Sequence, residues 1–73
     1  MTRQYPYRIT LYMYSGLLER HHFMASNYQD AFSKAHHFAV PIAMSGRDGV
    51  QFIDVKKLTK KDVTDRHIIL EEV

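Results

Sequence analysis

The stretch YRITLYMY, residues 7–14, decides the fold because its side chains alternate in character along the chain. One side of the alternation carries Tyr7, Ile9, Leu11 and Met13. The other side carries Arg8, Thr10, Tyr12 and Tyr14. Successive side chains of a β-strand point to opposite faces of its sheet, and strands are rich in β-branched and aromatic residues. The stretch therefore predicts a strand with one face in the core and one wetter face.

Two further strands are predicted around this one. Ser15-Gly16 indicates a turn, because Gly tolerates positive φ, and residues 17–24 then form the returning strand of a hairpin. Residues 50–58 predict another strong strand, which follows a turn with two glycines at 45–49. Residues 42–44 predict a short extended piece before that turn.

The register of the hairpin has two candidates. A two-residue loop would pair Ile9 with His22. A three-residue loop that extends through Leu17 would pair Ile9 with Phe23. A slip of one residue moves every side chain of the returning strand to the other face. We prefer the second register, because burying Phe23 is worth a few kcal/mol more than burying Arg20.

Residues 26–39 predict a helix. Ser26 and Gln29 have the spacing of a capping box, in which each side chain bonds the backbone near the other. A single apolar stripe follows at helical spacing, made of Tyr28, Ala31, Phe32, Ala35, Phe38 and Ala39. We expect Pro41 to end the helix, because a proline disfavours the α conformation at the residue before it, Val40.

The C-terminal part predicts a turn at 59–62 and a terminal strand at 66–73, although Thr59 could cap a helix. A helix from Val63 through Leu70 is the alternative to the strand. The expected order is therefore ββαββ. This is an α+β fold in which one helix packs on an antiparallel sheet, as a single domain over residues 1–73.

Length and composition restrict the function. A chain of 73 residues buries only about 60% of its surface, so its large apolar residues are needed for the core. We expect the layer between helix and sheet to be filled by Ile9, Leu11, Phe23, Phe32, Phe38, Phe52 and Ile53. Little then remains to build a pocket, which favours a function carried by the surface.

Several classes of protein do not fit. The absence of Cys excludes a disulfide framework, a thiolate metal site and a Cys nucleophile. No apolar run approaches the length of about 18 residues that spans a bilayer, so we expect no membrane association. The first residues contain no apolar segment of the kind found in secretory signals, which favours the cytoplasm.

The histidines do not form a metal motif. They occur as two adjacent pairs, His21-His22 and His36-His37, and a single His67. Neighbouring residues point to opposite faces in a strand and diverge by about 100° in a helix, so one site could take only one member of each pair. We expect no bound metal. The second pair is expected in the last helical turn, where a protonated imidazole complements the helix dipole.

No signature of catalysis is present either. The chain has no phosphate-binding G-x-x-x-x-G-K and no G-x-S-x-G nucleophile motif. The two glycines at 45–49 are explained by a turn. We therefore expect no catalytic residues, no cofactor and no enzymatic activity.

The wetter face of the first strand is the best candidate for a binding surface. Tyrosine and arginine are enriched at the hot spots of protein interfaces, and they stack on bases in sheet-type RNA readers. The residues expected to contact a partner are Arg8, Tyr12, Tyr14 and Arg20. The structural alternative is that the tyrosines only stabilise cross-strand pairs.

A lysine cluster suggests a second kind of partner. It consists of Lys56, Lys57, Lys60 and Lys61. These side chains could contact the phosphates of a nucleic acid, or form exposed ion pairs of little energetic value with Asp62 and Asp65.

One family resemblance arises around the predicted helix. The strand end Phe23-Met24-Ala25, then Ser26 with Gln29-Asp30-Ala31, then Val40-Pro41 and another strand, resembles small phage-encoded host-takeover proteins such as the T7-type inhibitor of host RNA polymerase. The chain lacks the acidic helix face of that inhibitor, so no functional residue is carried over. The resemblance implies a mode of action, in which a small protein docks on a larger one and blocks it.

The sequence therefore predicts a non-enzymatic binding protein of phage or mobile-element origin. Its expected action is to inhibit or modulate a host protein or protein complex in the host cytoplasm. The alternative is a small nucleic-acid-binding protein that uses the Tyr/Arg face and the lysine cluster. An edge-paired homodimer is a further expectation, since a small open sheet leaves strand edges unpaired.

Overall fold

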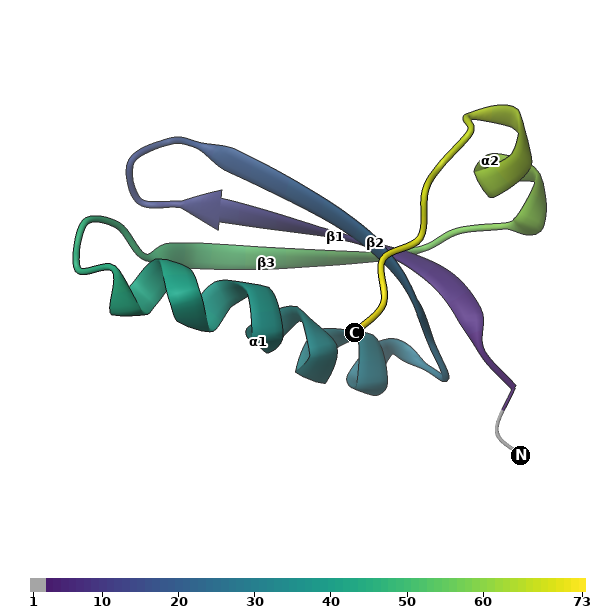
Figure 1. Ribbon diagram of the computed structural model, residues 1–73, viewed down its shortest axis with the longest axis horizontal. Coiled ribbons are helices and arrows are strands. Elements are labelled where there is room, and N and C mark those ends of the chain that lie inside the picture. The colour runs from purple at the N-terminus through teal and green to yellow at the C-terminus, as the bar shows by residue number, and fades with distance from the viewer. Residues whose placement is uncertain (1–2) are drawn as a thin grey trace.

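The computed structural model describes residues 3–73, which form a three-stranded antiparallel sheet with a long helix along one face (Figure 1). The elements are β1 (Tyr5–Met13), β2 (Leu18–Ala25), α1 (Tyr28–Met44), β3 (Val50–Lys57) and α2 (Lys60–Asp65). The strand order is β2-β1-β3, so β1 pairs on both sides. The α+β class is confirmed. The predicted ββαββ order is wrong at its last element, because the observed order is ββαβα.

The alternation in β1 places one row of side chains in the core, as predicted. Tyr7, Ile9, Leu11 and Met13 are all buried on the side that faces α1. Tyr7, Ile9 and Leu11 form one core cluster with Phe23 and Ala25 from β2 and with Ala31 and Ala35 from α1. The two helical alanines are fully buried and small, so they bring the helix axis close to the sheet. This single layer between α1 and the sheet is the hydrophobic core.

The hairpin register differs from both predicted ones. Tyr7 pairs with Phe23 and Ile9 pairs with His21. The loop has three residues but comprises 14–16, because the backbone N–H of Met13 donates to Leu17 O at 3.0 Å. Gly16 ends the loop with φ of +93°, the left-handed conformation common at this place in three-residue hairpins. The shift from the preferred register is two residues, which leaves the facing of each side chain unchanged. Phe23 is buried as expected.

Helix α1 starts later than predicted. Its N-cap is Asn27 rather than Ser26, and Asn27 Oδ1 accepts a hydrogen bond from the Asp30 backbone N–H at 2.8 Å. Asp30, not Gln29, reaches back, because its carboxylate accepts from the Ser26 backbone N–H at 2.9 Å. This reciprocal pair satisfies backbone donors that a helix start leaves without partners.

The same helix also ends later than predicted. Pro41 lies inside α1, so it does not end the helix, and residues 42–44 form its last turn rather than an extended piece. Proline removes one N–H from the ladder, but its carbonyl still accepts from the Ser45 N–H at 3.1 Å. Ile42 packs against the core, and this burial offsets the lost bond. The histidine pair His36-His37 is therefore in the middle of the helix and not in its last turn.

A bulge in β3 decides which of its side chains face the helix. Tyr12 pairs with Phe52 and Met13 pairs with Val50, so Gln51 is an extra residue on β3. Ile53 lies opposite Leu11 on the covered side. Phe52 thus points to the uncovered face and is 57% exposed, which corrects its predicted place in the core. Phe32, also predicted in the core, is 45% exposed on α1.

The residues after β3 form a short helix instead of the predicted turn. Thr59 caps α2 through a capping box, in which Thr59 Oγ1 accepts from the Asp62 N–H and Asp62 Oδ2 accepts from the Thr59 N–H. His67 then takes φ of +52°, and the Ile68 N–H donates to Val63 O at 3.1 Å. These bonds close the helix in a Schellman motif, so it does not continue to residue 70.

The predicted terminal strand is also absent within the described residues. After α2 the chain crosses back toward the start of α1 (Figure 1). Its one ladder contact is an isolated parallel bridge between Phe23 and Glu71, where the Glu71 N–H donates to His22 O at 2.7 Å. The segment therefore borders the outer edge of β2 without becoming a fourth strand.

Candidate binding surface

The sheet face opposite α1 carries two rows of distinct character. The strand register aligns Leu18, Tyr12 and Phe52 across β2, β1 and β3, and we call this set the apolar row. It likewise aligns His22, Arg8 and Lys56, which we call the basic row. Between the rows, Thr10 has Arg20 on one side and Asp54 on the other. One end of the open face is thus apolar and the other end is cationic.

The apolar row is exposed although its members are large. Leu18 is 54% exposed, Tyr12 is 36% exposed and Phe52 is 57% exposed. The rings of Tyr12 and Phe52 contact each other with centroids 5.5 Å apart and planes tilted by 46°. Single apolar side chains scattered over a protein surface are normal. This row instead places three large ones side by side on adjacent strands.

The basic row is held by a hydrogen bond between neighbouring strands. Arg8 Nε donates to His22 Nε2 at 3.1 Å, and both side chains are half-buried. A ring nitrogen that accepts this bond must be unprotonated. Burial lowers the pKa of His22, and the adjacent Arg8 charge lowers it further. The imidazole is therefore held neutral while the guanidinium supplies the charge of the row.

Three of the four predicted contact residues lie together on this face. Arg8, Tyr12 and Arg20 come from adjacent positions on β1 and β2. Tyr14 does not join them, because it belongs to the hairpin loop beyond the strand. Its N–H donates to Gly49 O at 3.0 Å, and a Cβ at Gly49 would lie only 3.3 Å from its ring. Tyr14 is thus 72% exposed but borders the α1–β3 connection instead.

The lysine cluster does not form one patch. Lys56 lies on the open face opposite Arg8, whereas Lys57 lies opposite Tyr7 and turns its amine over the Tyr5 ring. Lys60 and Lys61 begin α2. The Asp62 carboxylate accepts hydrogen bonds from the backbone N–H and from the hydroxyl of Thr59. These bonds, of which the backbone one has the larger effect, hold the Asp62 pKa below its ordinary value. No salt bridge between these lysines and Asp62 or Asp65 occurs in the described part of the chain.

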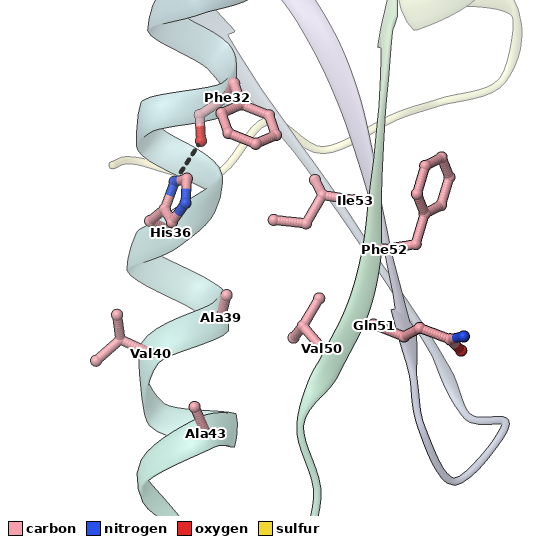
Figure 2. A pocket seen from close by; sticks show the side chains of 9 residues that line it. All are labelled: Phe32, His36, Ala39, Val40, Ala43, Val50, Gln51, Phe52 and Ile53. Carbon is pink, nitrogen blue, oxygen red and sulfur yellow. Dashed lines mark hydrogen bonds between the residues drawn. The ribbon is translucent and has the colours of Figure 1, made fainter.

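A groove borders the open face along β3. It has a volume of about 570 Å³ and lies between α1 and β3. Figure 2 shows Phe32, Ala39, Val50 and Ile53 turned toward this gap, while Phe52 points to the other side of β3. Within residues 3–73, β3 pairs only with β1, so its outer edge has unpaired backbone groups beside the groove. The predicted homodimer requires an unpaired strand edge of this kind.

The histidines are used for local contacts. Both ring nitrogens of His21 contact carboxylates, Nε2 to Glu19 at 2.6 Å and Nδ1 to Glu71 at 2.8 Å, and the ring stacks on Phe38. His36 Nδ1 lies 2.9 Å from the carbonyl of Phe32 in the preceding turn (Figure 2). Among residues 3–73, no three His, Asp or Glu side chains come together as a metal ion would require.

Comparison with known proteins adds no assignment. No protein-family model, no curated protein and no solved structure matches this chain. Neither of the two helices within residues 3–73 has both the length and the apolar character of a membrane-spanning helix.

Two of the surface residues were missed by sequence reasoning. Leu18 and Phe52 complete the apolar row, but only the strand order and register place them beside Tyr12. Leu18 falls beside the turn, where its facing depends on the loop. For Phe52 a signal was present, because Phe52 and Ile53 are neighbours in a strand and cannot both face the core.

Proposed function

We propose that the protein is a non-enzymatic binding module that docks on a larger protein through the open face of its sheet. The observation that carries the proposal is the apolar row, with its three large, exposed side chains on adjacent strands. Burying the remaining exposed part of such a side chain is worth about 1 kcal/mol. A partner that covers all three gains about 3 kcal/mol from this row alone, and a central tyrosine is a preferred hot-spot residue.

The charged and apolar side chains of the open face indicate which surface would be complementary to it. Beyond the apolar row, the next two rows of the open face carry Arg8, Arg20 and Lys56 but one carboxylate, that of Asp54, so this part of the face is cationic. The complementary surface is an apolar patch flanked by acidic groups. The resemblance to phage-encoded inhibitors adds the proposal that this partner belongs to a host complex in the cytoplasm, which the protein inhibits or modulates.

A capture experiment with matched variants tests the proposal. Tagged wild-type protein is used to recover and identify a partner from host lysate, and the binary affinity is then measured with purified components. We expect Leu18→Ala to weaken binding and Leu17→Ala to leave it unchanged, because Leu17 is also exposed (64%) but lies outside the row. Circular dichroism verifies that both variants are folded. Equal affinities for the two variants would exclude the apolar row as the binding surface.

A second candidate function is supported by the pair of rings. Tyr12 and Phe52 are exposed on adjacent strands of an open sheet, with Arg20 and Lys56 nearby. Sheet-type RNA readers stack unpaired bases on rings in this arrangement. Fluorescence anisotropy with a single-stranded oligonucleotide at two salt concentrations distinguishes the candidates. If the oligonucleotide binds through its phosphates and through stacking on the rings, its affinity must fall as the salt concentration rises. The absence of binding at micromolar protein concentration would exclude this candidate function.

The unpaired edge of β3 supports self-association as a further proposal. Two copies that pair their β3 strands would extend the sheet and cover the groove beside α1. Sedimentation over a range of concentrations measures this directly. A rise from monomer to dimer mass supports the pairing, and a constant monomer mass excludes it.

A further inference from the structure

A second hollow lies at the far end of the sheet from the hairpin loop. It is formed by the start of β1, the end of β3, α2 and the C-terminal segment, which all meet at this end in Figure 1. Its volume is about 520 Å³, within the range of sites for small molecules. The apolar part of its lining is mainly aliphatic and consists of Pro6, Met24, Leu58, Val63 and Leu70, with the ring of Tyr5 beside them. We call this hollow the α2 pocket.

Three cations also line the α2 pocket. They are Arg3 before β1, Lys57 at the end of β3 and Lys60 at the start of α2. The Lys57 amine lies 3.9 Å from the ring centroid of Tyr5, and the Arg3 guanidinium carbon lies 5.4 Å from the same centroid. The electron-rich face of an aromatic ring attracts cations, so Tyr5 gathers both at the pocket.

The positive charge of the pocket is not neutralised by a carboxylate. In the described chain, none of Arg3, Lys57 and Lys60 forms a salt bridge. The Asp62 carboxylate at the start of α2 is already occupied by two hydrogen bonds from Thr59. The Glu71 carboxylate contacts His21 instead. An anion that entered the pocket would therefore meet three cations that, among the described residues, form no salt bridge with an internal carboxylate.

We propose that the α2 pocket binds a medium-chain aliphatic carboxylate. The alkyl chain lies against the aliphatic lining, and the carboxylate accepts hydrogen bonds from Lys57 and Lys60. A purely polar anion such as phosphate would leave the apolar lining exposed, and a neutral chain would leave the cations without a partner. The capping box and the Schellman motif fix α2 at both ends, so its side of the pocket is formed before the ligand arrives.

Titration with octanoate and decanoate, below their micellar concentrations, tests this site. We expect saturable shifts of the backbone amides of Met24, Leu58, Val63 and Leu70 in NMR spectra. Two added methylenes should tighten binding by up to about 15-fold, and decanol, which lacks the charge, should bind at least tenfold more weakly. These measurements need no variant, so they stand even where a substitution disturbs the fold.

A pair of charge-matched variants isolates the role of the cations. The double variant Lys57→Gln/Lys60→Gln removes two lining lysines, and Lys56→Gln/Lys61→Gln removes two lysines that do not line the pocket. Both lose the same net charge. We expect at least tenfold weaker binding of decanoate for the first and less than a twofold change for the second. Equal losses in both variants, equal binding of decanol, or no saturable shift with millimolar decanoate would overturn the proposal.

Discussion

The two sheet phenylalanines Phe23 and Phe52 provide a direct test of which face of the sheet is covered. Phe23 is fully buried and its ring stacks with Phe38 at a centroid distance of 6.0 Å, whereas Phe52 is 57% exposed on the open face. Truncation of a buried phenylalanine to alanine costs about 3–5 kcal/mol, because the loss of transfer free energy adds to the cost of the cavity. Truncation of a half-exposed one costs about 1 kcal/mol.

These magnitudes are large relative to the stability of the chain. A domain of 73 residues has a free energy of unfolding of about 4–11 kcal/mol. We therefore expect Phe23→Ala to remove between about a quarter and all of it, while Phe52→Ala leaves a cooperatively folded protein. Urea unfolding followed by circular dichroism measures both values. If Phe52→Ala were as damaging as Phe23→Ala, the assignment of Phe52 to the open face would be refuted, and with it the apolar row.

Three further predictions concern local features. Thr59→Ala removes the two hydrogen bonds of the Thr59 hydroxyl, one accepted from the Asp62 N–H and one donated to the Asp62 carboxylate. It should destabilise α2 by about 1 kcal/mol, seen as faster amide hydrogen exchange confined to residues 60–66. Unchanged exchange there would contradict the capping role. Pro41→Ala restores a backbone N–H near the C-terminal end of α1 and should raise the free energy of unfolding by about 1 kcal/mol, as measured in urea; a decrease would show that the proline stabilises the helix. The pKa of His22 is lower in the folded chain than in the unfolded chain, so on acidification the unfolded chain takes up the proton first. The contribution of His22 to stability is therefore complete above about pH 6.5 and is lost as the pH falls through the folded pKa. Unfolding curves at pH 7.5 and 5.5 should therefore differ less for His22→Gln than for wild type, and an identical difference would contradict this assignment.

The strand pattern was the most informative part of the sequence. The alternation in residues 7–14 placed Tyr7, Ile9 and Leu11 in the core without knowledge of any other element. It succeeded because β1 is central and has one covered face, so the period of two is not disturbed. The facing of Phe23 followed from the energetic preference for burying an aromatic ring, even though the loop that sets the register was misplaced.

The errors came from local rules that tertiary packing overrides. Pro41 predicts a helix end by its own conformational effect, but the burial of Ile42 one residue later continues the helix. The six residues of α2 are too few for an apolar stripe, so only the Thr59–Asp62 spacing indicated the helix. The terminal strand was predicted from a run of apolar residues that in fact follows the Schellman turn at His67.

The candidate surfaces could be predicted only in part. Arg8, Tyr12 and Arg20 follow from strand alternation, and the structure brings them together. Phe52 joins them because β3 pairs with β1, and no local pattern specifies which strand is the neighbour. The α2 pocket depends on the fold bringing Arg3, Lys57 and Lys60 to one hollow, and these residues belong to different parts of the chain. Its existence also corrects the expectation that so small a core leaves little room for a pocket.

The proposed binding of a protein partner by the apolar row can be measured with purified components. The affinity of the captured partner is determined for Tyr12→Ala/Phe52→Ala and for Leu17→Ala. Each ring truncation at a hot spot costs more than about 1 kcal/mol, so we expect at least 30-fold weaker binding for the double variant, roughly the product of two such losses. An affinity equal to that of Leu17→Ala, in a double variant with unchanged circular dichroism, would contradict the claim.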